Sequence, residues 1–536
     1  MIGLVHLIQR WLCRAGEVLL RHYLAYVLIF VTVLLSTRYV LGGRGRLLPP
    51  GPWGLPIIGF LPFMSNEVHK MFFRLAKKYG QVYRIQVGEK LFVILTDPKV
   101  IKEAFRREEF NVRPSTALYD MFEGYGLVNT SGLIWKDQRR FIHERMRAFG
   151  MKTTGPGREQ MQDTIMVEVE NLLQCLATGE GKPMEVAELF SNATTNVICS
   201  FLMSLRFRPN FANFPSFKRL LALQDEGFKL FLKCDIANYV PFFKYMPSVR
   251  RNFRRLIACR DESVEMIQDI ISQRRKTFDP EHIRDILDSY LLEEYRAKKE
   301  GRILFEGRDF DRQLVQVMND MFSAGQETVK TCLLWSLVFL LNHPHVASKV
   351  QAELDSIVGR SRMPTLDDQQ HMPYTEATIC EVLRRSSIVP LGTSHATSRE
   401  TTLGEYTIPK GATVIPLLYA CHMNPQYWTD PEEFNPLRFI DAEGNVKKPE
   451  HFLPFGVGRR MCLGHVLAKS QLFLYFTSIL HVFNISCPEN EPLPSMEGDL
   501  GTTLTPKPFK ICFIPREVSK IVNLDMRPHD LRTAGL

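Results

Sequence analysis

The chain lacks the closely spaced cysteines that disulfide frameworks and structural zinc sites use. Its eleven cysteines are scattered through 536 residues, and none stands in a C-x-x-C pair. Their odd number argues against a complete set of disulfides, so a reducing compartment is the better expectation. Internal repeats and low-complexity tracts are absent from the sequence as well.

No segment concentrates a strong charge of either sign. The formal net charge of +9 is a modest excess, and nothing resembles a nucleic-acid-binding arm. We therefore expect no nucleic-acid partner, whereas a basic face toward an anionic membrane or an acidic protein is allowed. With 45% hydrophobic residues, a chain of this length can bury a core large enough to shelter a cofactor.

The N-terminal apolar run is slightly shorter than a full membrane span. Residues 22–37 carry no formal charge apart from His22, and sixteen residues fall short of the roughly 20 that a spanning helix needs. Flanking arginines can reach the membrane interface, and no clear small-x-small cleavage site follows. We expect residues 1–44 to be an uncleaved membrane anchor. A cleaved signal peptide and a transit peptide are the alternatives, the latter because the first fifty residues contain six arginines and one acid.

Beyond the anchor the sequence predicts a connector, one large body and a tail. Residues 47–60 contain four prolines and three glycines, so we expect a stiff connector over 45–56 that is either a linker or a hinge. The alternating pattern of 81–97 predicts a strand hairpin, and helical patterns dominate after Pro98. The body is expected over 57–515, and 516–536 predicts a loosely ordered tail.

A helix of about 32 residues is predicted over 310–341, and its centre reads AGQET. A glycine inside a helix costs ~1 kcal/mol relative to alanine, so Gly325 needs a reason. Either it lets another helix pack closely, or a flat bulky group lies against this face. Glu327 and Thr328 stand beside it, and an acid next to a hydroxyl can relay protons.

In each of two further helical patterns, an arginine shares one helix face with a side chain that it can contact. Glu381 and Arg384 are spaced i,i+3, and Arg438 follows in a proline-interrupted stretch as a candidate third member. Trp135 and Arg139 are four residues apart, which fits either a surface patch or a clamp on an anionic ligand. None of these pairs is specific by itself.

The stretch PFGVGRRMCLGH, residues 454–465, places one cysteine among three glycines and two arginines. It offers no second ligand for zinc, and Met461 occupies the place of the third glycine of a nucleotide loop. Taken with A-G-x-E-T, E-x-x-R and the arginine of P-L-R-F, in this order and spacing, the F-G-x-G-x-R-x-C-x-G loop resembles that of the cytochrome P450 family. The resemblance spans about residues 46–516.

The resemblance implies a mainly α fold with small β-sheets, built as a single large haem-containing domain behind a membrane anchor. In the family the cysteine equivalent to Cys462 is the axial ligand of haem iron, and the acid and hydroxyl equivalent to Glu327 and Thr328 deliver protons to bound oxygen. Glu381, Arg384 and Arg438 would form a structural triad. Haem b would also be contacted by Arg113, Trp135, Arg139, Ala324, His395, Phe455, Arg460 and Gly464.

The implied activity is a monooxygenase reaction that uses O2 and NADPH. Electrons would come from NADPH–cytochrome P450 reductase, with cytochrome b5 as a second donor, at the endoplasmic reticulum membrane and facing the cytosol. A mitochondrial inner-membrane location is the alternative.

A closer resemblance concerns the substrate. The stretches FRREEF (105–110), WKDQRRF (135–141) and LRRSSIVPLGTSHATSRE (383–400) are similar to those of insect members that hydroxylate ecdysteroids. They imply hydroxylation of 20-hydroxyecdysone at C-26, which would inactivate the moulting hormone. The alternatives are a monooxygenase for another steroid, a fatty acid or a xenobiotic, and a haem-thiolate isomerase or non-catalytic haem binder.

Overall fold

The computed structural model describes residues 22–23, 25–27, 29–33, 47–116, 120–208 and 214–516. Most of the predicted anchor, residues 1–44, and all but the first residue of the predicted tail, 516–536, lie outside the described residues. Within the described part of the chain, no helix combines the length and the apolar character needed to cross a bilayer.

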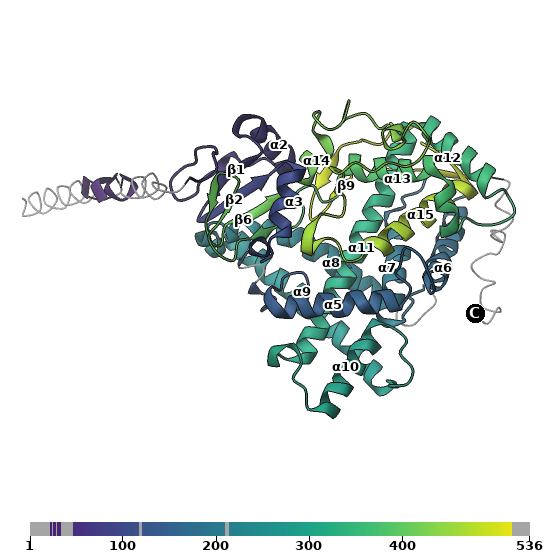
Figure 1. Cartoon of the computed structure of the whole chain (residues 1–536), viewed down its shortest axis with the longest axis horizontal. Coiled ribbons are helices and arrows are strands. Elements are labelled where there is room, and N and C mark those ends of the chain that lie inside the picture. Colours follow the sequence, from purple (N-terminus) through teal and green to yellow (C-terminus); the bar gives the residue numbers. More distant parts are fainter. Residues whose placement is uncertain are drawn as a thin grey trace, which may run out of the picture.

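A four-stranded sheet in the order β1-β2-β6-β3 lies beside helix α2 (Figure 1). The predicted hairpin is confirmed: β1 (Val82–Val87) and β2 (Lys90–Leu95) pair antiparallel, and Gly88 takes a positive φ of 56° at their turn. β6 (Thr413–Pro416) pairs parallel with β2, and β3 (His395–Ala396) pairs antiparallel with β6. The sheet therefore brings residue 395 close to residues of the N-terminal hairpin.

The proline-rich connector is fixed to this part of the molecule. Leu47 accepts a hydrogen bond from the amide of Thr407 at 2.8 Å, and Pro50 accepts one from the amide of Arg84 at 2.7 Å. A Cβ at Gly51 would lie 2.0 Å from the Arg84 carbonyl oxygen, so only glycine permits this approach. The role of residues 45–56 as a hinge stays a prediction.

Helices make up most of the remaining body (Figure 1). They are α2 (Val68–Tyr79), α3 (Pro98–Arg106), α5 (Gly132–Ala148), α6 (Arg158–Ala177), α7 (Ala187–Met203), α8 (Phe214–Cys234), α9 (Pro247–Lys276), α10 (Ile286–Glu300), α11 (Phe310–Asn342), α12 (Pro344–Ile357), α13 (Pro373–Ser386), α14 (Leu418–Met423) and α15 (His465–Val482). Three two-stranded sheets complete it: β4 (Thr401–Leu403) with β5 (Tyr406–Ile408), β7 (Phe483–Ser486) with β10 (Cys512–Pro515), and β8 (Gly498–Leu500) with β9 (Leu504–Pro506). This is the mainly helical fold with small sheets that the sequence predicted.

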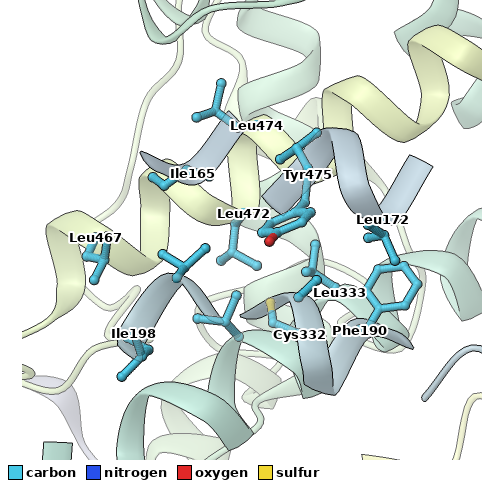
Figure 2. Close-up of a cluster of buried hydrophobic side chains, with 14 of the residues drawn as sticks. Ile165, Leu172, Phe190, Ile198, Cys332, Leu333, Leu467, Leu472, Leu474 and Tyr475 are labelled. Carbon is cyan, nitrogen blue, oxygen red and sulfur yellow. The ribbon is translucent and has the colours of Figure 1, made fainter. Parts of the chain in front are cut away.

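The largest hydrophobic core lies between α6, α7, α11 and α15, whose side chains interdigitate in Figure 2. The long helix predicted over 310–341 is confirmed as α11, which is capped by the Asp309 carboxylate and followed at once by Pro344 at the start of α12. The Trp335 indole nitrogen donates a hydrogen bond of 2.8 Å to the Leu504 carbonyl, which ties β9 to this helix. The core thus holds α11 and α15 in fixed positions relative to each other.

Candidate active site

Two glycines with left-handed backbone conformations shape the cysteine loop. Gly456 and Gly458 have φ values of 72° and 81°, and a Cβ at Gly458 would lie 2.3 Å from the carbonyl oxygen of Phe105 in α3. The Cys462 amide donates a hydrogen bond of 3.0 Å to the Phe455 carbonyl, which closes the loop just before α15 begins at His465. The loop therefore presents Cys462 at the N-terminal end of a core helix.

The electrostatic environment of the Cys462 sulfur contains opposing effects. Burial raises the pKa of the thiol, while the Gly464 amide and the positive charge of Arg139 lower it. Amide hydrogens and a guanidinium near a sulfur stabilise its thiolate form, which is the form that binds metals.

A cavity of about 360 Å³ separates the cysteine loop from α11. Cys462 lies on one side of it, and Ala324, Gly325 and Thr328 line it from α11. Most of the other lining side chains are apolar; those from α7 and from the stretch after α13 are Ile198, Phe201, Leu202, Ile388 and Val389. The cavity can therefore hold a flat apolar group between a sulfur and the face of a helix.

Positive side chains gather at one part of the cavity. Arg460 is only 9% exposed, its guanidinium lies 4.1 Å from the centre of the Trp135 ring, and it donates hydrogen bonds to the carbonyls of Asn111 at 2.8 Å and Thr130 at 2.6 Å. Burial, and then the neighbouring charges of Arg113 and Arg139, lower the pKa of Arg460 to about 8. Burying this much positive charge is costly unless an anion is present.

The other cations in this region also contact backbone carbonyls. Arg113 donates to Val128 at 2.9 Å and to Ser394 at 2.6 Å, and Arg139 donates to Met461. The His395 ring lies 2.7 Å from the Phe110 carbonyl through Nδ1, and burial, followed by the charge of Arg113, lowers its pKa to about 3.

The residues present fit haem. Its two propionates match the buried cations, its apolar ring matches the lining, and its iron matches the sulfur of Cys462, the one cysteine among the described lining residues.

Within the AGQET stretch, the side chains of Glu327 and Thr328 lie in different surroundings. Thr328 lines the cavity and donates a hydrogen bond of 3.0 Å to the Ala324 carbonyl. Glu327 is absent from the described lining, because its carboxylate forms an ion pair with Lys330 and accepts a hydrogen bond of 3.1 Å from Thr503. A Cβ at Gly325 would lie 2.5 Å from Ile198 of α7, so close helix packing requires this glycine even though it also lines the cavity.

The residues of the predicted triad, Glu381, Arg384 and Arg438, are brought together. The Glu381 carboxylate accepts hydrogen bonds from Nε and Nη2 of Arg384 at 2.7 and 2.8 Å. It accepts another from Nε of Arg438 at 3.0 Å. Glu381 and Arg384 are both fully buried, and Arg384 also donates to the carbonyls of His422 and Pro431, each at 2.8 Å. The network joins α13 to the segment that leads to the cysteine loop, whereas its effect on stability stays a prediction.

All nine predicted cofactor contacts line this cavity. They are Arg113, Trp135, Arg139, Ala324, His395, Phe455, Arg460, Cys462 and Gly464, and Thr328 lines it as well. Asp320, a buried acid of α11, lines the same cavity. No role was predicted for this side chain, although an acid inside an apolar helix four residues before Ala324 is costly to bury.

Comparison with known proteins agrees with this geometry. The sequence profile described as Cytochrome P450 matches residues 49–513. Cytochrome P450 18a1 of Drosophila melanogaster is 48% identical over 492 residues, which cover 91% of this chain and 90% of that protein. Cytochrome P450 2U1 of Rattus norvegicus is 34% identical over 517 residues, covering 91% and 94%. Cytochrome P450 2J2 of Homo sapiens is 32% identical over 499 residues, covering 91% and 95%. The chain belongs to the Cytochrome P450 family of haem-containing monooxygenases.

Proposed function

We propose that this protein hydroxylates the side chain of ecdysteroids at C-26, with 20-hydroxyecdysone as the substrate, and that Cys462 supplies the thiolate ligand of its haem. The observation that carries the monooxygenase activity is the cavity in which the Cys462 sulfur faces Thr328 of α11. The steroid assignment is supported by the similar stretches 105–110, 135–141 and 383–400, and by a mostly apolar lining whose polar members include Asp320 and Thr393.

The chain's own residues have three tasks in this reaction. The buried arginines and His395 would hold the cofactor by its carboxylates, and the glycine loop would hold the sulfur in place. When bound, haem b supplies the oxygen chemistry, with electrons from NADPH through a reductase partner. The apolar side chains exclude water and orient the substrate.

Proton delivery is the third task. We assign it to the Thr328 hydroxyl, because that hydroxyl lines the cavity directly, and to Glu327 as the proton source behind it. Since Glu327 is paired with Lys330, it must leave this ion pair before it can supply a proton to the cavity. Thr328→Val should keep haem binding while diverting electrons from product to hydrogen peroxide or water, and Thr328→Ser should restore coupling. Equal coupling in wild type and Thr328→Val would exclude this role.

The substrate assignment is tested by optical titration of the purified protein followed by product analysis. We expect 20-hydroxyecdysone to give the high-spin shift, because a substrate displaces iron-bound water, and reduced enzyme to form the 26-hydroxy product. A long-chain fatty acid is the comparison. If the fatty acid alone shifts the spectrum and is hydroxylated, the protein is a monooxygenase of a different substrate class. If a shift occurs without product or NADPH consumption, the isomerase or binder alternative holds.

An endoplasmic reticulum location is also part of the proposal. Trp53 and Ile57 are 67% and 65% exposed, and Phe242 and Tyr245 are 73% and 68% exposed. The two segments meet at the β1–β2 turn, where the Gly88 amide donates to Ile58 at 3.0 Å and the Glu89 amide donates to Tyr239 at 3.1 Å. Such an apolar patch suits contact with a membrane.

Cell fractionation tests the location. The full-length protein should fractionate with microsomes and accept electrons from NADPH–cytochrome P450 reductase. Fractionation with mitochondria and dependence on a ferredoxin would show that residues 1–44 are a transit peptide.

A further inference from the structure

Residues 124–128 form a segment without helix or strand that runs beside the N-terminal half of α11. Two of its side chains, Leu127 and Val128, line the cavity. A loop in this position would ordinarily be free to move, because its backbone has no ladder of hydrogen bonds to a neighbouring strand. Here the side chains of α11 supply such a ladder.

Two side chains of α11, those of Gln313 and Asp320, pair with three consecutive backbone units of the segment, and a third, that of Gln316, supports Asp320. Gln313 forms a reciprocal pair with Gly126: the Gly126 amide donates to Oε1 at 3.0 Å, and Nε2 donates to the Gly126 carbonyl at 3.1 Å. One oxygen of Asp320 accepts the amides of Leu127 and Val128 at 2.7 and 2.9 Å. Gln316 donates to the other oxygen of Asp320 at 2.8 Å.

The spacing of these residues places them on one face of the helix. Positions 313, 316 and 320 follow the i, i+3, i+7 pattern, so all three side chains project toward the same segment. Gln313, Gln316 and Asp320 are 0%, 6% and 8% exposed. No ion pair joins Asp320 to a cation within the described ranges, and burial raises the pKa of its carboxyl while the two backbone amides oppose that rise. Burying a carboxylate without a cation costs free energy, and the hydrogen bonds from the amides of Leu127 and Val128 offset this cost.

The segment is built to accept this contact. Gly126 has a φ of 91°, and a Cβ there would lie 2.5 Å from the Asp320 carboxylate and 2.7 Å from Gln316 Cγ. Val128 is held on both sides, because its amide donates to Asp320 while its carbonyl accepts from Arg113 Nε. The wall of the cavity is thus connected to an arginine that we assign to the cofactor.

We infer that Gln313, Gln316 and Asp320 are positioning residues that fix Leu127 and Val128 as a rigid wall of the cavity, and so limit the size of ligand that the cavity admits. The inference rests on the proposed function only in taking this cavity as the substrate site. It does not depend on which substrate is used.

The test measures backbone order and ligand size in the haem-loaded, full-length protein. Gln313→Met removes the Gly126 pair with little change of volume, and Asp320→Leu removes the acceptor of two amides. Asp320→Asn keeps one acceptor oxygen and serves as the conservative variant. Asp311→Leu is the matched control, because Asp311 lies on the same helix with a 66% exposed side chain.

We expect hydrogen exchange at residues 126–128 to be about tenfold faster or more in Gln313→Met and Asp320→Leu, and near wild type in Asp320→Asn and Asp311→Leu. Optical titration with two azoles gives the second readout: imidazole should bind all variants alike, whereas the affinity for bulky clotrimazole should change at least about threefold in the first two. Hydrogen exchange at residues 126–128 that stays at the wild-type rate in Gln313→Met and Asp320→Leu would overturn the inference. Faster exchange in these variants with an unchanged ratio of the clotrimazole and imidazole affinities would overturn it as well. Should Asp320→Leu fail to fold, Gln313→Met carries the same test. Because no steroid is used, failure of the ecdysteroid assignment leaves this result intact.

Discussion

Arg460 carries a charge that the folded chain alone does not neutralise. Its hydrogen-bond partners within the described residues are the carbonyls of Asn111 and Thr130 and, at 3.4 Å, the hydroxyl of Ser131. Carbonyls and hydroxyls offset the cost of burying a guanidinium only in part, which is why its pKa is lowered. A carboxylate from the cofactor would remove this penalty, so we propose that Arg460 serves to bind haem more than to stabilise the fold.

Arg460→Met should therefore accelerate the loss of haem by about tenfold or more, since a hydrogen bond to a charged group contributes ~1.5–3 kcal/mol. The measurement is transfer of haem to an excess of apomyoglobin, followed by absorbance. Arg459→Met is the matched control, because the neighbouring arginine is exposed. Equal rates of haem loss in the two variants would contradict the assignment.

At the scale of elements, α13 is joined to the segment before the cysteine loop by buried charges. Arg384 and Glu381 are fully buried, and the Arg384 guanidinium lies 5.2 Å from the centre of the Trp428 ring. A network of this kind is stabilising only while it is complete, because one missing partner leaves a buried charge uncompensated.

Glu381→Ala should lower the free energy of unfolding by ~3–5 kcal/mol, measured from the denaturant midpoint. Asp137→Ala removes an ion pair of the same i,i+3 spacing, with Arg140, in which both side chains are more than half exposed. It should change stability by less than ~1 kcal/mol. If the two substitutions have equal effects, α13 is not held in place by the triad.

Elements differ in how far the sequence predicts them. The hairpin of β1 and β2 and the helix α11 follow from local periodicity and are confirmed. The parallel pairing of β2 with β6 joins Phe92 to Thr413, and no local pattern contains it. The direction of the Glu327 side chain was equally unpredictable, since it depends on Lys330 and on Thr503 from the β8–β9 turn.

At the scale of the whole molecule, buried histidines make stability depend on pH. His69 and His422 are each 1% exposed, and burial lowers their pKa values to about 4 and about 3, from 6.5. Neither His69 nor His422 lines the cavity. Because the unfolded chain binds these protons more tightly, their contribution is complete above pH 6.5 and is lost as the pH falls toward 4.

The thermal midpoint should accordingly be lower at pH 5 than at pH 7.5, with His69 alone accounting for about 2 kcal/mol of the loss. His69→Phe should reduce this loss, because neither ring nitrogen has a partner within the described residues and the edge-on contact with Tyr419 is preserved. His282→Phe, at an exposed position, should leave the pH dependence unchanged. An unaltered acid loss in His69→Phe would show that other groups are responsible.

For the cavity, the sequence predicts which residues are brought together but not how all of its walls are held in place. The cysteine loop and the arginine positions come from short motifs, and these residues do meet in one place. The hydrogen bonds that order residues 124–128 could not be predicted, because they come from side chains of α11 that lie almost two hundred residues later in the chain.

The absorption spectrum of the reduced, carbon-monoxide-bound protein tests directly whether the sulfur of Cys462 is the iron ligand. Wild type and Cys487→Ser should show the red-shifted band that gives the family its name, because thiolate ligation produces it. Cys462→His should retain haem and lose that band. Survival of the band in Cys462→His would contradict the account.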